Sequence, residues 1–284
     1  MRRPPRLRPG DSVGVCAPSG PAPREAFEAG MAIIAARYDV IDCGGVADGA
    51  VDDARRLAGL RRALVEEDVR AVFCARGGYG LLRVAANIPE GPPRAVVGFS
   101  DVTVLHAALW RRGVVSVHGP NVTTLGRLED ADSDALFALL ENPVAPPPIA
   151  GLRMIAPGVA RGPLVGGNLA MLSHLIGTPL WPDLRGAVVF LEDVNEEPYR
   201  VDRMLTHLRL AGALEGVAGI ACGEFFACGD AEAVLAERLG ELGVPVVAGI
   251  PTGHGTRNRA LPHGACVALD AEAGILTFEE GAVS

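Results

Sequence analysis

Short apolar runs alternate with helical periodicity along the first half of the chain. Valine-rich runs begin near residues 12, 38, 71, 95 and 114, and longer stretches with apolar positions three or four apart lie between or after them. This alternation is typical of βαβ units, whose strands form a mainly parallel sheet. The pattern predicts an α/β fold with strands over 12–17, 38–43, 71–75, 95–99 and 114–118, and helices over 24–37, 52–67, 102–111 and 133–141.

Five prolines interrupt this pattern between residues 142 and 157. Proline fixes φ and lacks an amide donor, so we interpret 142–157 as a linker between an N-terminal domain of residues 1–141 and a C-terminal domain of residues 158–284. The second half predicts helices over 168–176, 201–210 and 231–242, and strands over 187–191, 218–222, 244–250, 265–269 and 275–278.

Composition narrows the class of protein. The 284 residues, 49% of them hydrophobic and 21% charged, are typical of a globular protein with about two domains. The net charge is 26 − 34 = −8, which argues against nucleic acid or an anionic membrane as a partner. All 26 basic residues are arginine, so chemistry that needs a lysine amine, such as a P-loop, a Schiff base or a Ser–Lys dyad, is excluded.

The sequence also predicts a cytoplasmic location. The apolar run 13–17 is too short for the core of a signal peptide. The longest span free of formal charge, 162–182, contains Pro163, Asn168, Ser173, His174 and Pro179 with four glycines, which argues against a transmembrane helix. The six cysteines form no CxxC pair, and we interpret them as reduced, mostly buried thiols.

Two glycine-containing loops follow predicted strands directly, where open α/β sheets bind ligands. The first is Arg-Gly-Gly-Tyr-Gly at 76–80, whose glycines allow either a plain turn or the close approach of a ligand. The second, Gly-Phe-Ser-Asp-Val-Thr at 98–103, is half of a GxSxG nucleophile elbow. Ser100 or Asp101 could simply cap the next helix, or Ser100 could be a nucleophile with the Asp101 amide as oxyanion donor.

Two carboxylates, Glu192 and Asp193, come at the end of the apolar strand predicted over 187–191. Acidic residues here are often a solvated helix entrance, because carboxylates favour the positive end of a helix. Glu192, however, directly adjoins the buried strand and would be held rigidly. That position suits a group that orients a catalytic histidine.

Six histidines could supply the base that a serine nucleophile needs. His254 is the best choice, because glycines on both sides leave its ring free to reach across a cleft, and His263 is the fallback. His118 is a candidate supporting residue or substrate contact. The remaining three are expected to be packing or surface residues: His106, His174 and His207.

Neither a metal nor a cofactor is expected. No HExxH, HxH or CxxC spacing occurs, and GxGxxG is absent. Cys74 precedes the first glycine loop and is an alternative nucleophile, but it falls on an apolar strand and is better explained as a core residue.

Seven blocks in order along nearly the whole chain together carry a resemblance: VCAPSGP at 15–21, ARGGYG at 75–80, GFSDVT at 98–103, HGP at 118–120, GGNLAML at 166–172, FLEDVNEEPYRVDRML at 190–205 and GHGTRNRALPHG at 253–264. The chain resembles the LD-carboxypeptidase family, serine peptidases that include muramoyl-tetrapeptide carboxypeptidases and microcin immunity peptidases. The resemblance implies a Ser100, Glu192 and His254 triad, with an oxyanion hole from the amides of Asp101 and Gly77 or Gly78.

The resemblance also implies an architecture. It consists of a flavodoxin-like N-terminal domain and a smaller C-terminal domain of swivelling β/α character, with the triad assembled between them. Family members are mostly cytosolic homodimers that need no cofactor.

A murein tetrapeptide is the substrate that the resemblance favours, cleaved at the LD bond before its terminal D-alanine during cell-wall recycling. Its free carboxylate calls for a cation, and Arg76, Arg200 and Arg203 lie in or beside the matching blocks. Two alternatives stay open: an immunity-type peptidase that cleaves an aminoacyl-nucleotide amide, and a non-catalytic α/β ligand-binding protein.

Overall fold

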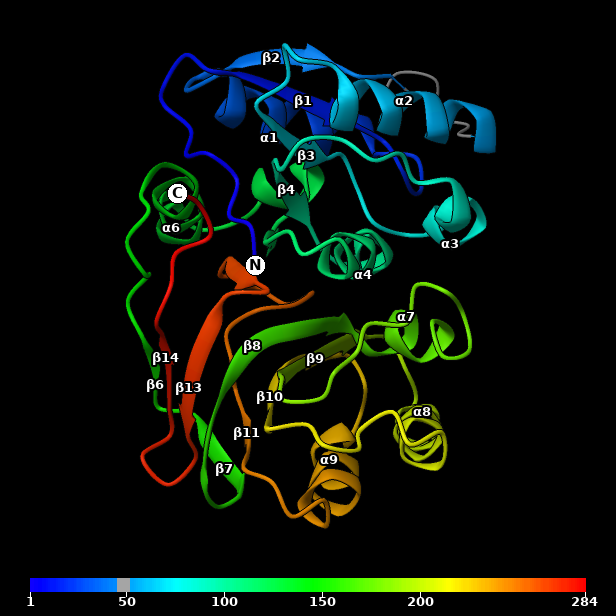
Figure 1. The fold of residues 1–284 in the computed structure, drawn as a ribbon, viewed down its shortest axis with the longest axis vertical. Helices are drawn as coiled ribbons and strands as arrows, with labels where there is room; N and C mark the ends of the chain where they lie inside the picture. Colours follow the sequence, from blue (N-terminus) through cyan, green and yellow to red (C-terminus); the bar gives the residue numbers. More distant parts are fainter. Residues whose placement is uncertain (45–51) are drawn as a thin grey trace.

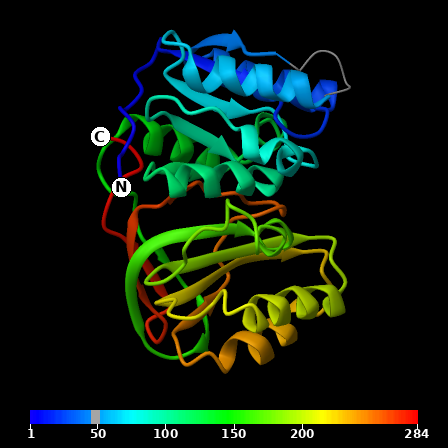
Figure 2. The same ribbon diagram turned by 45° about the vertical axis from the view of Figure 1, so that its right-hand side comes forward.

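Two sheets with their helices lie one above the other in the computed structural model, which describes residues 1–44 and 52–284 (Figures 1 and 2). The two ends of the chain lie side by side, since the amide of Ser284 donates to the carbonyl of Pro4 at 2.9 Å. None of the helices in these residues is long and apolar enough to cross a membrane.

The first sheet contains the five strands predicted for the first half of the chain. In spatial order its strands are β12 (Leu261–His263), β5 (Ser116–His118), β4 (Ala95–Gly98), β3 (Ala71–Cys74), β1 (Ser12–Cys16) and β2 (Asp39–Asp42). All neighbours are parallel except β12, which runs antiparallel to β5. The five predicted strands are confirmed to within two residues at each end.

Helices cover both faces of this sheet because its strands are apolar on both sides. One face packs against α1 (Arg24–Ala35), α5 (Val122–Leu125) and α6 (Asp130–Glu141). The other packs against α2 (Asp53–Val65), α3 (Leu81–Val84) and α4 (Thr103–Arg111). Successive residues alternate between the faces, so Phe73 belongs to the first core and Val72 to the second.

The second sheet is mixed. In spatial order its strands are β6 (Ile149–Ala150), β14 (Ile275–Phe278), β13 (Cys266–Asp270), β8 (Val159–Asn168), β9 (Val188–Val194), β10 (Gly219–Phe226), β11 (Val246–Ala248) and β7 (Arg153–Ala156). Strands β8 to β11 are parallel and the others antiparallel. Helices α7 (Leu169–His174), α8 (Pro198–Leu210) and α9 (Ala231–Gly240) cover one face (Figure 1). The predicted α/β class with two units is confirmed.

The structure differs from expectation in strands that lack a clear apolar pattern. Strand β8 contains Pro163 and three glycines, β6 and β7 lie inside the proline-rich segment, and β12 has three residues. Strand β9 extends beyond the predicted end at 191 to Val194, so Glu192 and Asp193 lie within it. Strands β6 and β7 belong to the second sheet, and the later strand β12 belongs to the first, so the chain passes between the sheets more than once. The division into 1–141, 142–157 and 158–284 stays a prediction.

Glycines allow β8 to approach the first sheet closely. A Cβ on Gly167 would lie 2.6 Å from Oγ1 of Thr103 on α4, and the amide of Asn168 donates to that oxygen at 3.0 Å. The amide of Gly166 donates to Nε2 of His263 on β12 at 3.2 Å. The sheets therefore meet through backbone contacts that a larger side chain would prevent.

Three buried histidines lie at this junction: His106, His118 and His263. The rings of His106 and His263 stack at 5.2 Å. Nε2 of His106 lies 2.8 Å from the carbonyl of Gly98, which can only accept. Burial lowers the pKa of His106 to about 4 and holds the pKa values of His118 and His263 well below the ordinary value.

We expect His106 to carry its proton on Nε2 and His263 on Nδ1, and both rings to be neutral at pH 6. Histidines of the unfolded chain have a pKa of about 6.5. Below that pH the folded state binds fewer protons at His106, so the share of stability from this ring is complete above about pH 6.5 and is lost as the pH falls toward 4. Long-range ¹H–¹⁵N spectra report each tautomer, and a charged His106 at pH 6 would contradict this expectation.

Candidate active site

Ser100 occupies a strained turn between β4 and α4, at the start of the 3₁₀ turn η2 (Ser100–Val102). Its φ of 67° lies in the left-handed region, which a residue with a Cβ adopts at a cost of about 1–3 kcal/mol. The turn is held by Asn121, whose Oδ1 accepts from the amide of Phe99 at 3.3 Å. Gly98 is required because a Cβ there would lie 2.9 Å from Val102. This is the backbone geometry of a nucleophile elbow, without its second glycine.

The glycine loop 76–80 follows β3 and lies directly against this serine. A Cβ on Gly77 would lie 2.7 Å from Cβ and 2.9 Å from Oγ of Ser100, so only glycine fits. The amide of Gly20 donates to the carbonyl of Gly77 at 3.1 Å, and Gly78 has a φ of 103°. The structure therefore brings together the two loops that the sequence singled out in the first half.

His254 and Glu192 form a hydrogen-bonded pair in the second half of the chain. Nδ1 of His254 lies 2.7 Å from Oε2 of Glu192, a carboxylate that is fully buried on β9. A carboxylate only accepts, so Nδ1 carries a proton, and in the neutral imidazole Nε2 is the nitrogen with the free lone pair. The imidazole lies against the ring of Phe99, with ring centroids 4.6 Å apart, which places it beside the residue that precedes Ser100.

The loop that carries His254 is fixed at its base and at its far side. The hydroxyl of Thr252 donates to the carbonyl of Arg259 at 2.7 Å, which closes the loop. Asp132, buried on α6, accepts from two nitrogens of Arg257 at 2.8 Å and from the amide of Asn258 at 3.1 Å. Burial favours a raised pKa for Asp132, but these donors outweigh it and lower the pKa. A charged contact thus ties the histidine loop to the first sheet's helices.

One cleft of about 550 Å³ contains both Ser100 and His254. No hydrogen bond joins them among residues 1–44 and 52–284. In hydrolases that use a serine and a histidine, this hydrogen bond is commonly longer without substrate and tightens when substrate binds. The cleft is lined by Pro23, Ala26, Arg76, Gly77, Gly78, Phe99, Ser100, Asn121, Thr123, Thr124, Arg127, Val194, Asn195, Phe226 and His254.

The lining of this cleft is cationic although the chain is acidic overall. It includes Arg76 and Arg127 and, within the described residues, no aspartate or glutamate. Arg76 is partly committed, because Nη1 donates to the carbonyl of Pro21 at 2.7 Å. The guanidinium of Arg127 has no partner in the part of the chain that the structure describes. An anionic group is the occupant that this lining favours.

Other predicted site residues lie outside this cleft. Arg200 and Arg203 are on α8, where their guanidinium groups lie over the ring of Tyr199 at 5.9 and 5.2 Å. His118 is 1% exposed behind Phe99, and neither of its ring nitrogens has a hydrogen-bond partner. His263, the fallback base, is buried against His106.

Several lining residues were missed by sequence reasoning, above all Asn121, Arg127, Asn195 and Phe226. Arg127 follows α5, which has four residues and so shows no periodicity. Asn195 has a φ of 56°, a left-handed conformation that asparagine adopts more readily than most residues. The asparagine itself, at the end of a predicted strand, was therefore a signal in the sequence for a special turn at this position.

The neighbouring acid Asp193 has a structural environment. Its carboxylate accepts from Nδ2 of Asn168 at 2.8 Å and from the amide of Ala170 at 2.9 Å, at the start of α7. Burial, and then the charge of Glu192, raise the pKa of Asp193 to about 6. Among the residues that the structure describes, no cluster of three or more histidine, cysteine or acidic side chains is placed to hold a metal ion. Cys74 is fully buried on β3.

Fold and geometry together define a class: α/β proteins in which a strained serine after a parallel strand shares a cleft with a carboxylate-bound histidine. The family models for the N-terminal and C-terminal domains of LD-carboxypeptidase match residues 13–119 and 161–269. The chain belongs to the LD-carboxypeptidase family, as the resemblance had indicated.

Relatives and solved structures agree over almost the full length. The chain is 40% identical to a putative carboxypeptidase of Streptomyces coelicolor, over 99% of this chain and 97% of that protein. It is 33% identical to a probable murein peptide carboxypeptidase of Bacillus subtilis, over 98% and 95%. The crystal structure of muramoyltetrapeptide carboxypeptidase from Oxalobacter formigenes has a TM-score of 0.82 at 30% identity, over 95% and 98%. Microcin C7 self-immunity protein, at 20% identity and a TM-score of 0.89, covers both chains fully and shares the fold.

We expect Gly77→Ala to reduce kcat by about 100-fold or more, because a displacement of about 1 Å at a nucleophile can cost that much. The added methyl group would lie 2.9 Å from Oγ of Ser100. Gly240→Ala is the matched control, since a Cβ there meets nothing closer than 4.0 Å. The carboxypeptidase activity of both variants relative to wild type is the measurement, and full activity in Gly77→Ala would contradict the packing described here.

Proposed function

We propose that this protein is a serine carboxypeptidase that hydrolyses the LD peptide bond of murein tetrapeptides and releases terminal D-alanine. The observation that carries the proposal is the pair of His254 and Glu192, 2.7 Å apart, in the same cleft as the strained Ser100. The names of the B. subtilis and O. formigenes proteins support the class of substrate.

The proposed reaction is acyl transfer in two steps. Nε2 of His254 takes the proton of the Ser100 hydroxyl as its oxygen attacks the scissile carbonyl, and Glu192 stabilises the imidazolium that forms. The amides of Asp101 and of Gly77 or Gly78 receive the developing oxyanion. His254 then protonates the departing amine of D-alanine, and water, deprotonated by His254, releases the remaining peptide from Ser100.

The cationic lining supports recognition of a free carboxylate beside the scissile bond. Arg76 and Arg127 line the same cleft as Ser100, and we propose that they bind the C-terminal carboxylate of D-alanine. Of the three arginines that the sequence suggested, this assignment retains Arg76. Arg127 takes the place of Arg200 and Arg203, which interact with Tyr199 on α8. A cytoplasmic homodimer completes the proposal, and light scattering after gel filtration measures the oligomeric state.

We expect wild-type protein to release D-alanine from a synthetic murein tetrapeptide, with or without a chelator, and Ser100→Ala to lose more than about 10⁴-fold in kcat. Mass spectrometry of the products is the measurement. An aminoacyl-sulfamoyl nucleotide offered in parallel distinguishes the immunity-type alternative. Cleavage of that compound alone would overturn the murein assignment, and binding without turnover of either compound would favour a ligand-binding protein.

We expect Arg127→Ala to raise KM for the tetrapeptide by about 10- to 100-fold, the effect of losing one charged hydrogen bond. The same peptide with a C-terminal amide should show little change, because it offers no carboxylate. Arg161→Ala is the control, since this arginine pairs with Glu279 on the surface at 2.8 Å. Equal effects on both peptides would show that Arg127 does not recognise the carboxylate.

A further inference from the structure

The carboxylate of Asp101 has no task in the proposed reaction, which uses only the backbone amide of this residue. Yet the side chain is only 2% exposed, directly after the nucleophile. Its Oδ2 accepts from the amide of Leu81 at 2.9 Å. Leu81 is the first residue of α3 and follows the glycine loop 76–80, so this hydrogen bond connects the far end of that loop to the turn that holds Ser100.

A buried arginine supports the same end of the loop. Arg56, on α2, donates from Nε to the carbonyl of Ser19 at 3.3 Å and from Nη1 to Asp53 at 2.8 Å. The backbone of Gly80 packs against the guanidinium of Arg56, and a Cβ on Gly80 would lie 2.4 Å from Nε of Arg56. The φ of Gly80, 134°, is a second reason why this position requires glycine.

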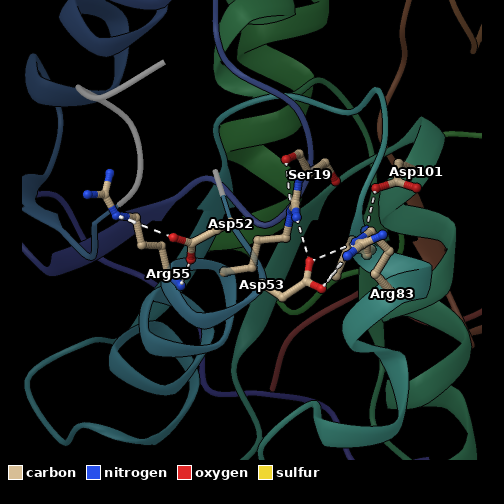
Figure 3. Close-up of polar contacts among 8 residues, drawn as sticks. Ser19, Asp52, Asp53, Arg55, Arg83 and Asp101 are labelled. Atoms are coloured by element: carbon tan, nitrogen blue, oxygen red, sulfur yellow. Dashed lines mark hydrogen bonds and ion pairs between the residues drawn. The ribbon is translucent and has the colours of Figure 1, made fainter. Parts of the chain in front are cut away.

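An ion pair extends this support to α3. Both carboxylate oxygens of Asp53 accept from Arg83, at 2.8 to 3.1 Å (Figure 3). Arg83 is the third residue of the same short helix that Leu81 begins. Charges of alternating sign therefore lie beneath the loop, from Asp101 through Arg56 and Asp53 to Arg83.

Burial has the largest effect on the pKa of Asp101. It raises the pKa of this carboxyl, and the hydrogen bond from the Leu81 amide and, to a smaller extent, the positive charge of Arg56 oppose it only in part. A buried carboxylate with a hydrogen-bonded backbone amide and a nearby cation is costly to place and is held in one position.

We propose that the Asp101 side chain is a positioning residue that fixes the glycine loop against Ser100 through the Leu81 amide. The loop is otherwise fixed at its start, where the amide of Thr123 donates to the carbonyl of Ala75 at 3.1 Å, and at Gly77 by Gly20. The Leu81 contact supplies the third point. Its effect on catalysis rests on the proposed function, in which an amide of Gly77 or Gly78 serves the oxyanion.

A positioning role of this kind affects the transition state more than substrate binding. Losing the Leu81 contact would move an oxyanion donor, and one such donor is worth about 100- to 1,000-fold in kcat. The arginines that we assign to the substrate carboxylate are not held by Asp101. Thus kcat should fall while KM changes little.

The test compares Asp101→Ala, Asp101→Asn and the wild type. Kinetics of D-alanine release give kcat and KM, and hydrogen exchange gives the protection of the amides of residues 77–81. Leu136→Ala is the control for stability, because this fully buried residue of α6 lies in the core on one face of the first sheet, whereas Leu81 lies in the core on the other face. All proteins are measured below their melting temperatures.

We expect Asp101→Ala to lower kcat by about 10- to 100-fold with KM within about threefold, and to speed exchange at 77–81. Asp101→Asn keeps an oxygen that can accept from Leu81, so it should recover part of kcat, and it carries the test if the alanine variant does not fold. Leu136→Ala should melt earlier with kcat unchanged.

Unchanged exchange at 77–81 in both Asp101 variants would overturn the positioning role, whatever the activity. A rise in KM at constant kcat would also overturn it, because it would assign the side chain to substrate binding. Faster exchange in the variants together with an inactive wild type would support the positioning role and refute the proposed function instead.

Discussion

The proposed nucleophile and its base come from different sheets, and the chemistry depends on how closely these sheets approach. Ser100 follows β4 of the first sheet, whereas Glu192 lies on β9 of the second and His254 follows β11. The approach is possible because β8 has Gly167 where it meets α4, and a Cβ there would lie 2.6 Å from Oγ1 of Thr103. The junction therefore combines backbone amides of β8 with buried side chains of the first unit, a close packing that leaves little room for adjustment.

The chain itself secures this junction. Strand β12 lies in the second half of the sequence but pairs with β5 of the first sheet, only a few residues after His254. The contact of Arg257 with buried Asp132 fixes the intervening loop to α6. The histidine is thus held from both sides, and its pairing with Glu192 sets which ring nitrogen is free.

Strain and charge are concentrated at the cleft. Ser100 has a positive φ, Gly77 has no space for a side chain, and a buried carboxylate follows the serine. Each feature is unfavourable alone and is retained where surrounding contacts determine the geometry. The cationic lining within an acidic chain is a further local departure, and it matches the free carboxylate that a carboxypeptidase must recognise.

Apolar periodicity predicted the parallel strands and long helices well, because burial on both faces leaves a direct pattern in the sequence. It missed β8, whose three glycines and Pro163 interrupt the apolar pattern, and β6, β7 and β12, which are too short to show a period. The candidate triad could be chosen from glycine-flanked loops and the family blocks. Arg127 could not, because its place in the cleft depends on the packing of a one-turn helix.

Trapping the covalent intermediate tests the central claim most directly. Wild-type protein quenched in acid during turnover of a tetrapeptide, followed by peptide mapping, should carry an adduct on Ser100 with the mass of the substrate acyl group, without D-alanine. An adduct on another residue would contradict serine acyl transfer. Turnover in which oxygen from labelled water enters the product, with no intermediate on Ser100 at any quench time, would contradict it as well.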